Sequence, residues 1–296
     1  MEHHREDEGD PGVDAADPQV VAFLGQAHAA VAAFGEALTA EGVLRGLLGP
    51  REIPRLWERH LLNSAAVAAL LPETGTLVDV GSGAGLPGVV LAAMRPRMRV
   101  VLLEPMERRV AWLEHVTALV GLDNVEVLRG RAEDVTGALH ADVVTARAVA
   151  PMARLAGWTL PLLVQGGVLL ALKGRQAGDE LAAASAELAR YGGDAGEVLQ
   201  LPSVPEVDPT TVVRVHRTSI PVAAPATGGG RTGRSSSRAV PGRGAEKRTD
   251  RSPGSSTSEG RAGSRSSSAG DGPRGTGGRG SRPRGPGERP SGPRTP

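Results

Sequence analysis

The segment Asp79-Val80-Gly81-Ser82-Gly83-Ala84-Gly85-Leu86-Pro87-Gly88 decides the fold of this 296-residue chain. It begins at the end of a short run of branched apolar residues, Thr76–Val80, and leads into a helix that we expect from about Leu86 to Met94. A strand, a glycine-rich turn and a helix in this order are typical of a parallel sheet whose strands alternate with helices. Glycines let the backbone turn tightly and let a ligand approach without meeting a Cβ atom, and the next helix begins with unpaired N–H groups. The segment therefore predicts a ligand site at the carboxyl end of a buried strand.

The chain on either side extends the same pattern as far as about Arg217, which is a length that suits one domain. We expect two lead-in helices, Val20–Phe34 and Ile53–Leu71, before the first strand. The expected strands are Thr76–Val80, Arg99–Leu103, Val125–Leu128, Asp142–Thr145, Val168–Leu172, Glu197–Leu201 and Thr211–Val215. The helices between them are expected over Leu86–Met94, Met106–Val120, Pro151–Leu163 and Asp179–Arg190. The sequence thus predicts a Rossmann-like α/β fold with a seven-stranded, mainly parallel sheet.

Composition divides the chain unevenly. From Gly228 onward nearly every residue is Gly, Ser, Arg, Pro or Thr, so this part has too little apolar surface to offset the entropy of ordering it. We expect an acidic disordered N-terminus (1–17), a helical lead-in (18–72), a catalytic core (73–218) and a disordered basic tail (219–296). From Arg231 onward 15 Lys and Arg face 5 Asp and Glu, a net charge of +10, which leaves −9 for the preceding part of a chain whose total is +1. A basic tail suggests contact with a polyanion, and an inert extension is the alternative.

The composition excludes several kinds of site and argues against secreted and membrane proteins. The chain has no cysteine, which rules out disulfides, thiolate metal sites and cysteine nucleophiles, and we expect no metal. The start, Met1–Asp17, has seven carboxylates and no apolar segment of a secretory signal, and we find no apolar run of 18 residues. We therefore expect a cytoplasmic protein with no membrane contact, and nothing in the sequence requires more than a monomer.

The glycine spacing does not by itself choose the cofactor. Gly83, Gly85 and Gly88 also satisfy the dinucleotide pattern G-x-G-x-x-G, and Glu104 at the end of the second strand suits a ribose in either case. Asp79, just ahead of the first glycine of the loop, favours S-adenosyl-L-methionine, because a carboxylate suits an ammonium and a sulfonium group and would repel a pyrophosphate. A dinucleotide-dependent oxidoreductase remains the alternative.

Five motifs together resemble one family. The chain is similar, from about Val43 to Arg217, to the ribosomal RNA small subunit methyltransferase G family, formerly called glucose-inhibited division protein B. Members are class I S-adenosylmethionine-dependent methyltransferases that make N7-methylguanine in 16S rRNA near the decoding centre. The motifs are Arg55-Leu56-Trp57-Glu58-Arg59-His60-Leu61-Leu62-Asn63-Ser64, Asp79–Gly88, Arg131-Ala132-Glu133-Asp134, Ala146-Arg147-Ala148 and Ala171-Leu172-Lys173-Gly174.

The resemblance implies the site residues. It makes Gly81 and Leu86 cofactor contacts in the loop, places Ala132 and Glu133 beside the adenine, and puts Arg147 at the active-site rim. With Asp79, Gly83, Gly85 and Glu104 these form the expected cofactor set. The chain departs from the family at Gly46-Leu47-Leu48, where members often carry Asn-Leu-Thr, and at Asn63, where they carry Asp. Both departures lie outside the glycine loop, so we expect them to affect the RNA-facing side more than methyl transfer.

Guanine N7 carries a lone pair and no proton, so its methylation requires positioning more than base catalysis. The sequence agrees, because Thr145-Ala146-Arg147-Ala148 stands where an amino-directed enzyme would carry an N/D-P-P-Y/F motif. We predict Arg147, Lys173 and His60 as functional side chains. The alternatives are a surface salt bridge of Arg147 with Asp142 or Glu133, a solvated Lys173, and a polar helix face around His60. Alternative functions are methylation of another acceptor and a non-catalytic role in binding RNA during ribosome assembly.

Overall fold

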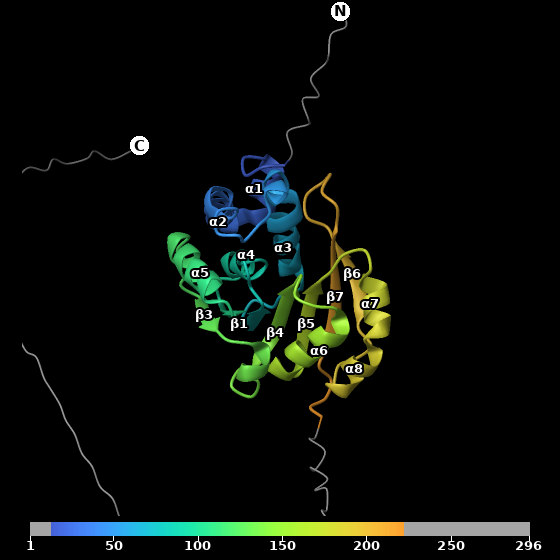
Figure 1. Cartoon of the computed structure of the whole chain (residues 1–296). Helices are drawn as coiled ribbons and strands as arrows, with labels where there is room; N and C mark the ends of the chain where they lie inside the picture. Colours follow the sequence, from blue (N-terminus) through green and yellow to red (C-terminus); the bar gives the residue numbers. More distant parts are fainter. Residues whose placement is uncertain (1–12, 222–296) are drawn as a thin grey trace, which may run out of the picture. The chain divides into compact units, whose positions relative to one another are not determined.

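A seven-stranded sheet forms the centre of the structure (Figure 1). The computed structural model describes residues 13–221, so most of the two expected tails lies outside the described residues. The strands lie in the order β3-β2-β1-β4-β5-β7-β6, with β7 antiparallel to both of its neighbours and the other pairs parallel. They are β1 (Gly75–Val80), β2 (Met98–Glu104), β3 (Val125–Arg129), β4 (Ala141–Arg147), β5 (Leu163–Leu172), β6 (Glu197–Leu201) and β7 (Thr210–His216). The expected seven-stranded α/β fold is confirmed, and each observed strand contains the predicted one.

The strand order reverses direction at β1. Strand β2 pairs with one edge of β1 and β4 with the other, so that Asp79 lies opposite Leu102 on one side and Thr145 on the other. The loops that leave the carboxyl ends of β1 and β4 therefore run to different faces of the sheet. In open α/β sheets such a reversal opens a crevice at the carboxyl ends of the strands, where ligands bind.

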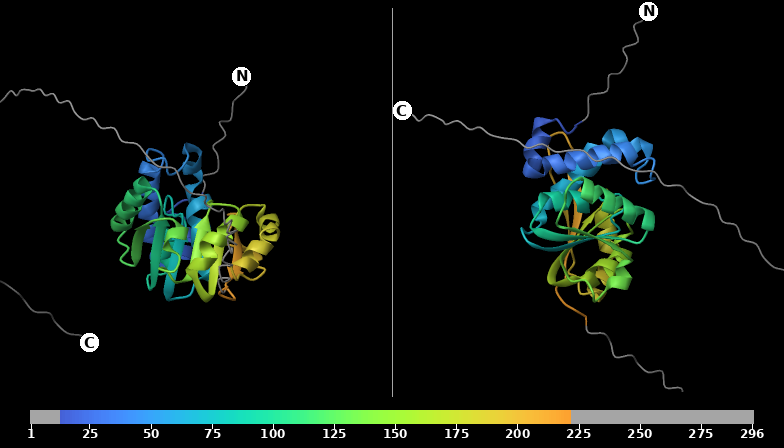
Figure 2. Two further views of the ribbon diagram at one scale, coloured as in Figure 1. Left: turned by 60° about the horizontal axis from the view of Figure 1, so that its bottom comes forward. Right: turned by 90° about the vertical axis from the view of Figure 1, so that its left-hand side faces the viewer.

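Helices cover both faces of the sheet because neighbouring residues of a buried strand point to opposite sides. On β1, Leu77 belongs to the core with α4 and α5, and Val78 to the core with α6, α7 and α8. Figure 2 shows these two helix layers on opposite sides of the strands. Their bounds are α4 (Gly88–Met94), α5 (Glu107–Leu119), α6 (Met152–Thr159), α7 (Ala177–Ala183) and α8 (Ser185–Arg190), with short 3-10 turns η5 (Ala132–Val135) and η6 (Leu160–Leu162).

The lead-in region packs outside α4 and α5 and shares their hydrophobic core. It begins with α1 (Pro18–Leu24), the 3-10 turn η1 (Gly25–Ala27) and α2 (His28–Glu41). The single helix expected over Ile53–Leu71 is wrong in detail. The chain instead forms η2 (Pro50–Arg55), a π-helical turn η3 (Trp57–Leu62), α3 (Asn63–Ala66) and η4 (Val67–Leu70). Pro54 lies inside η2 and lacks the N–H that a regular helix needs, and the π turn carries an i→i+5 pattern that shifts the carbonyls of its residues.

The stretch Pro18–Glu41 has the length and hydropathy of a membrane span. It is not the continuous apolar run that the sequence was expected to lack, because Gln26, His28 and Glu36 lie within it. In the structure the stretch is interrupted by η1, and Val31, Phe34 and Leu38 are buried in the core shared with α4 and α5. The described domain uses these apolar residues to pack the lead-in region.

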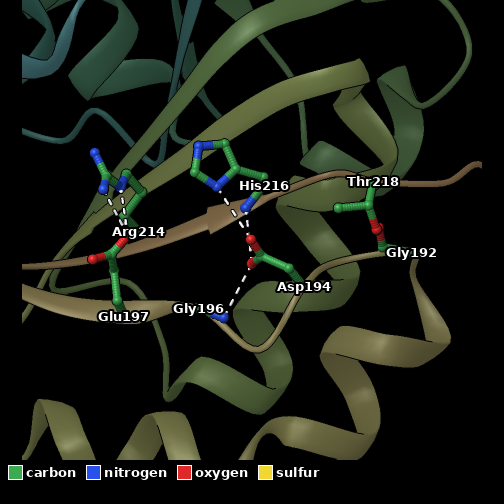
Figure 3. Close-up of polar contacts among 7 residues, drawn as sticks. All are labelled: Gly192, Asp194, Gly196, Glu197, Arg214, His216 and Thr218. Carbon is green, nitrogen blue, oxygen red and sulfur yellow. Dashed lines mark hydrogen bonds and ion pairs between the residues drawn. The ribbon is translucent and has the colours of Figure 1, made fainter.

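Polar contacts fasten the antiparallel edge of the sheet (Figure 3). Asp194 accepts the backbone N–H groups of Gly196 at 3.0 Å and His216 at 3.1 Å, and its other oxygen lies 3.1 Å from His216 Nδ1. Arg214 of β7 pairs with Glu197 of β6 at 2.6 Å. Because β7 runs antiparallel, His216 lies at the end of the sheet away from the carboxyl ends of β1 and β4. These contacts stabilise the edge and take no part in the crevice.

Candidate active site

A cavity of about 450 Å³ opens at the strand-order reversal. Its walls come from the glycine loop after β1, the end of β2, the loop and turn after β3, and the end of β4. The predicted residues that line it are Gly81, Gly83, Leu86, Glu104, Ala132, Glu133, His60 and Arg147. Its volume lies in the usual range for a small-molecule site, about 300–1,000 Å³. Motifs that are far apart in the sequence thus meet around one space.

The glycine loop is shaped by two requirements on its backbone. Gly83 has a φ of +56°, which side-chain-bearing residues rarely adopt, and it faces the cavity. Gly88 begins α4 so close to the sheet that a Cβ there would overlap Leu102 and lie 2.7 Å from Asp79 Oδ2. Gly83 therefore leaves room for a ligand, and Gly88 lets α4 begin in close contact with β1 and β2.

Glu104 is buried at the end of β2 and holds the glycine loop. Its Oε2 accepts the N–H of Gly83 at 3.0 Å, and its Oε1 accepts the N–H of Met106 at 3.0 Å. Arg109 lies 3.9 Å from the same carboxylate. The two backbone N–H groups and the nearby guanidinium hold the Glu104 side chain at the cavity wall, where its remaining lone pairs can accept hydroxyl groups of a ligand.

Asp79 and Gly85 occupy other places than expected. Asp79 is buried under the loop and does not line the cavity; its Oδ2 accepts the N–H of Gly88 at 3.1 Å, and its Oδ1 accepts the hydroxyl of Thr145 at 3.0 Å. Burial raises the pKa of Asp79 to about 6, against the hydrogen bonds that stabilise its charge. Gly85 packs inward, where a Cβ would meet Val89 at 2.7 Å and Phe34 at 3.1 Å. The structure therefore gives both residues a role in shaping the loop in place of the predicted direct contact.

Arg147 lies at the cavity wall and is held by the lead-in region. Its Nη2 donates to the backbone oxygen of Arg59 at 2.9 Å and contacts His60 Nδ1. The salt bridge with Asp142 or Glu133 that we considered is not among the ion pairs of residues 13–221. His60, in turn, is buried with its Nε2 2.7 Å from Glu52 Oε2, so the alternative of a polar, solvent-exposed helix face does not hold at this position.

Lys173 lies outside the first cavity, at the end of β5. Its ammonium donates to Glu180 Oε2 at 2.8 Å and to the backbone oxygen of Ala150 at 2.7 Å, so it is neither solvated nor free. The hydrogen bond from Lys173 lowers the pKa of Glu180, whose Oε2 also accepts the N–H of Met152. Lys173 thus ties the segment after β4 to α7 and lines a second cavity of about 580 Å³.

Comparison with known proteins decides the family. The family model described as rRNA small subunit methyltransferase G matches residues 27–206. The chain belongs to this family. It is 53% identical over 202 residues to a ribosomal RNA small subunit methyltransferase G from Nocardioides sp., with 67% of this chain and 81% of the relative covered. It is 48% identical to the one from Salinispora arenicola, with 75% of this chain and all of the relative covered. An O-methyltransferase from Thermotoga maritima, at 17% identity, has a TM-score of 0.43 and covers 54% of this chain and 66% of its own.

Family membership confirms the resemblance that the motifs suggested, and it shows the chain to be an rRNA methyltransferase of the small subunit. The structure changes the weight of the two departures from the family pattern. Leu47 and Leu48, which stand where family members often carry Leu and Thr, line the first cavity. This difference from the family therefore affects the cavity proposed for the cofactor and not only the RNA-facing side. Asn63 accepts the hydroxyl of Thr210 at 3.0 Å and lines the two outer cavities.

Sequence reasoning missed several residues of the site. Met106 and Arg109 line the first cavity from the start of α5, and Glu52 binds His60. The two cavity residues follow Glu104 by two and five residues, and that closeness is a signal that could have indicated them. Glu52 carries no such signal, because its partner lies across the break between η2 and η3.

Proposed function

We propose that the chain transfers the methyl group of S-adenosyl-L-methionine to N7 of a guanine in 16S rRNA of the small ribosomal subunit. The observation that carries the proposal is the cavity at the strand-order reversal, where the glycine loop and Glu104 lie on one side and Arg147 on the other. Such a substrate implies action in the cytoplasm. The family assignment supports the reaction class and the rRNA substrate, and the geometry of the cavity supports the choice of positions.

The cavity residues fit the methyl donor. Glu104 offers accepting oxygens for ribose hydroxyls, and Ala132 and Glu133 line the cavity where the adenine is expected. Leu86 and Met106 add apolar surface for the ring and the methionine chain. Gly81 and Gly83 leave the space beside the loop open. When bound, S-adenosylmethionine supplies a methyl group on a sulfonium that leaves as a neutral thioether.

The acceptor side lies beyond Arg147. This residue also lines the second cavity and a third of about 580 Å³, and both reach the surface beside Asn63 and Arg175. Within residues 13–221, the hydrogen bonds of Arg147 do not use all of its guanidinium N–H groups. The remaining N–H groups can donate to guanine O6 or to phosphate. We propose that the target base enters through these outer cavities and that Lys173 shapes their wall through Glu180 and Ala150.

The reaction requires little acid-base chemistry from the protein. The N7 lone pair forms the new bond to the methyl carbon while the carbon–sulfur pair returns to sulfur, so the positive charge moves to the base and no proton has to leave. Holding N7 in line with the methyl group can supply up to about 7–11 kcal/mol of the barrier in favourable cases. Arg147 donates hydrogen bonds to the backbone oxygens of Arg59 and His60. A guanidinium held in this way is suited to positioning the guanine.

The test is methyl transfer to isolated small subunits, with the modified base located by mass spectrometry of nuclease fragments. We expect one N7-methylguanine in 16S rRNA, and calorimetry should show binding of S-adenosylmethionine with no RNA present. Binding of the donor with methylation only of a different acceptor would refute the substrate. Absence of donor binding to folded protein would refute the whole proposal.

A further inference from the structure

Arg147 is the residue that the first cavity shares with both outer cavities. Its guanidinium therefore lies between the space for the methyl donor and the space for the acceptor. The groups that hold it come from η3, in the lead-in region, and not from the sheet that carries it. The direction of this side chain is thus set by a segment of the chain that precedes the strand by more than eighty residues.

The contact with His60 fixes the position of one proton. An arginine side chain only donates hydrogen bonds, so His60 Nδ1 must accept from Arg147 Nη2. The ring is then neutral and carries its proton on Nε2. That nitrogen lies 2.7 Å from Glu52 Oε2 and donates to it. Glu52 therefore selects the form of His60 that can receive Arg147.

We infer that Glu52 and His60 are positioning residues for Arg147, and that a second proton on His60 releases Arg147 from the wall between the donor and acceptor cavities. With protons on both nitrogens, the Nδ1–H group of His60 faces the N–H group of Arg147, and the two positive groups repel each other. The inference rests on the proposed function for its catalytic consequence. The coupling among the three side chains is independent of any substrate.

The surroundings of His60 set the pH at which this happens. The charged groups that face it are Glu52 from η2, Arg59 from η3 and Arg147 from β4. Burial and the charge of Arg147 lower the pKa of His60 from 6.5, Arg59 adds to the decrease, and Glu52 opposes it. Farther charges of the third cavity are those of Arg55, Glu58, Arg175, Glu206 and Asp208. His60 is therefore neutral at pH 7, and the positioned state of Arg147 prevails from neutral pH upward.

The first experiment measures single-turnover methylation of small subunits between pH 5 and 8. For the wild type we expect a rate that is level above pH 7 and falls below pH 6.5. Glu52→Gln keeps an accepting oxygen for His60 Nε2 but removes the charge, so the fall should move to lower pH. His60→Phe should lower the rate roughly tenfold or more at pH 7.5 and remove the fall in acid. His115→Phe is the matched control, because His115 also lies near a glutamate, Glu41 at 3.7 Å, but on the surface.

The second experiment needs no substrate. Nitrogen-15 NMR of the full chain, with the His60 signals assigned by their loss in His60→Phe, reports which ring nitrogen carries the proton. We expect the Nε2–H form at pH 7.5, a pKa of His60 that rises in Arg147→Gln, and one that falls in Glu52→Gln. An Nδ1–H form, or a pKa that neither substitution moves, overturns the inference even if the enzyme is active. The expected NMR result in a protein that methylates no small subunit supports the coupling and refutes the proposed function alone.

Discussion

Replacing Asp79 by Asn should stabilise the protein at neutral pH, although the residue lies under the glycine loop. The amide oxygen of Asn can accept the N–H of Gly88, as Asp79 Oδ2 does now. The amide N–H can donate to the hydroxyl of Thr145, which then accepts instead of donating. Each neighbour keeps one hydrogen bond to residue 79, and the buried charge is removed.

The magnitude follows from the pKa of Asp79. Burial raises it from 3.8 to about 6 in the folded state. Between these two values the folded protein holds a proton that the unfolded chain has released, so the free energy of unfolding falls as the pH rises through this window. At about 1.4 kcal/mol per pH unit, the gap between 3.8 and 6 corresponds to about 3 kcal/mol. The ionised carboxylate thus costs up to about 3 kcal/mol at pH 7, and Asp79→Asn should recover a large part of it.

The assay is urea denaturation of wild type and variant at pH values from 4 to 8, followed by circular dichroism. We expect the gain in Asp79→Asn to be near zero at pH 4 and to reach its full size above pH 6.5. Asp142→Asn is the control, since Asp142 also accepts a backbone N–H, that of Thr76 at 2.7 Å, but is exposed. A variant that is less stable than the wild type at pH 7, or a gain that does not depend on pH, would refute this reasoning.

Three further substitutions and one truncation test the site. Gly81→Val should weaken S-adenosylmethionine binding at least 100-fold by calorimetry, because Gly81 has a left-handed backbone and a Cβ there would lie 3.0 Å from Val149. The control is Gly121→Val: Gly121 has a similar φ of +69° but lies in open space, so the affinity should stay within threefold. Glu104→Gln places an amide N–H group opposite one of the two backbone N–H groups that Glu104 now accepts, so the affinity for S-adenosylmethionine should fall tenfold or more. An unchanged affinity would contradict the role given to the carboxylate. Lys173→Met should lower the free energy of unfolding by about 1–3 kcal/mol at pH 7. This loss should shrink as the pH falls below 4.5, because Lys173 lowers the pKa of its partner carboxylate only in the folded state; a loss that persists in acid would assign it to packing. Removing 228–296, which lies outside the described residues, should leave donor binding intact, and a large loss of affinity would show that the tail belongs to the site.

Much of the fold follows from local sequence. The strand pattern and the glycine loop depend on residues close together in the chain, and for this reason the observed strand bounds differ from the expected ones by only a few residues at most ends. The exception is β5, which begins at Leu163 and not near Val168, because Gly166 and Gly167 obscure the pattern where the strand is irregular. Helix breaks were also missed, as at Ala184 between α7 and α8, where no proline or glycine marks the end.

The sequence alone determined the order of strands and helices, the position of the glycine loop at the end of β1, and the family to which the motifs belong. These features depend on hydrophobic period and on backbone freedom, which are properties of neighbouring residues. Only the tertiary structure decided that Asp79 lies under the loop while Glu104 lies at the wall, since both are acidic residues at strand ends. It alone brought Glu52 and His60 to Arg147, because hydrogen bonds between distant segments depend on how the lead-in region packs over the sheet, and no local pattern records that packing.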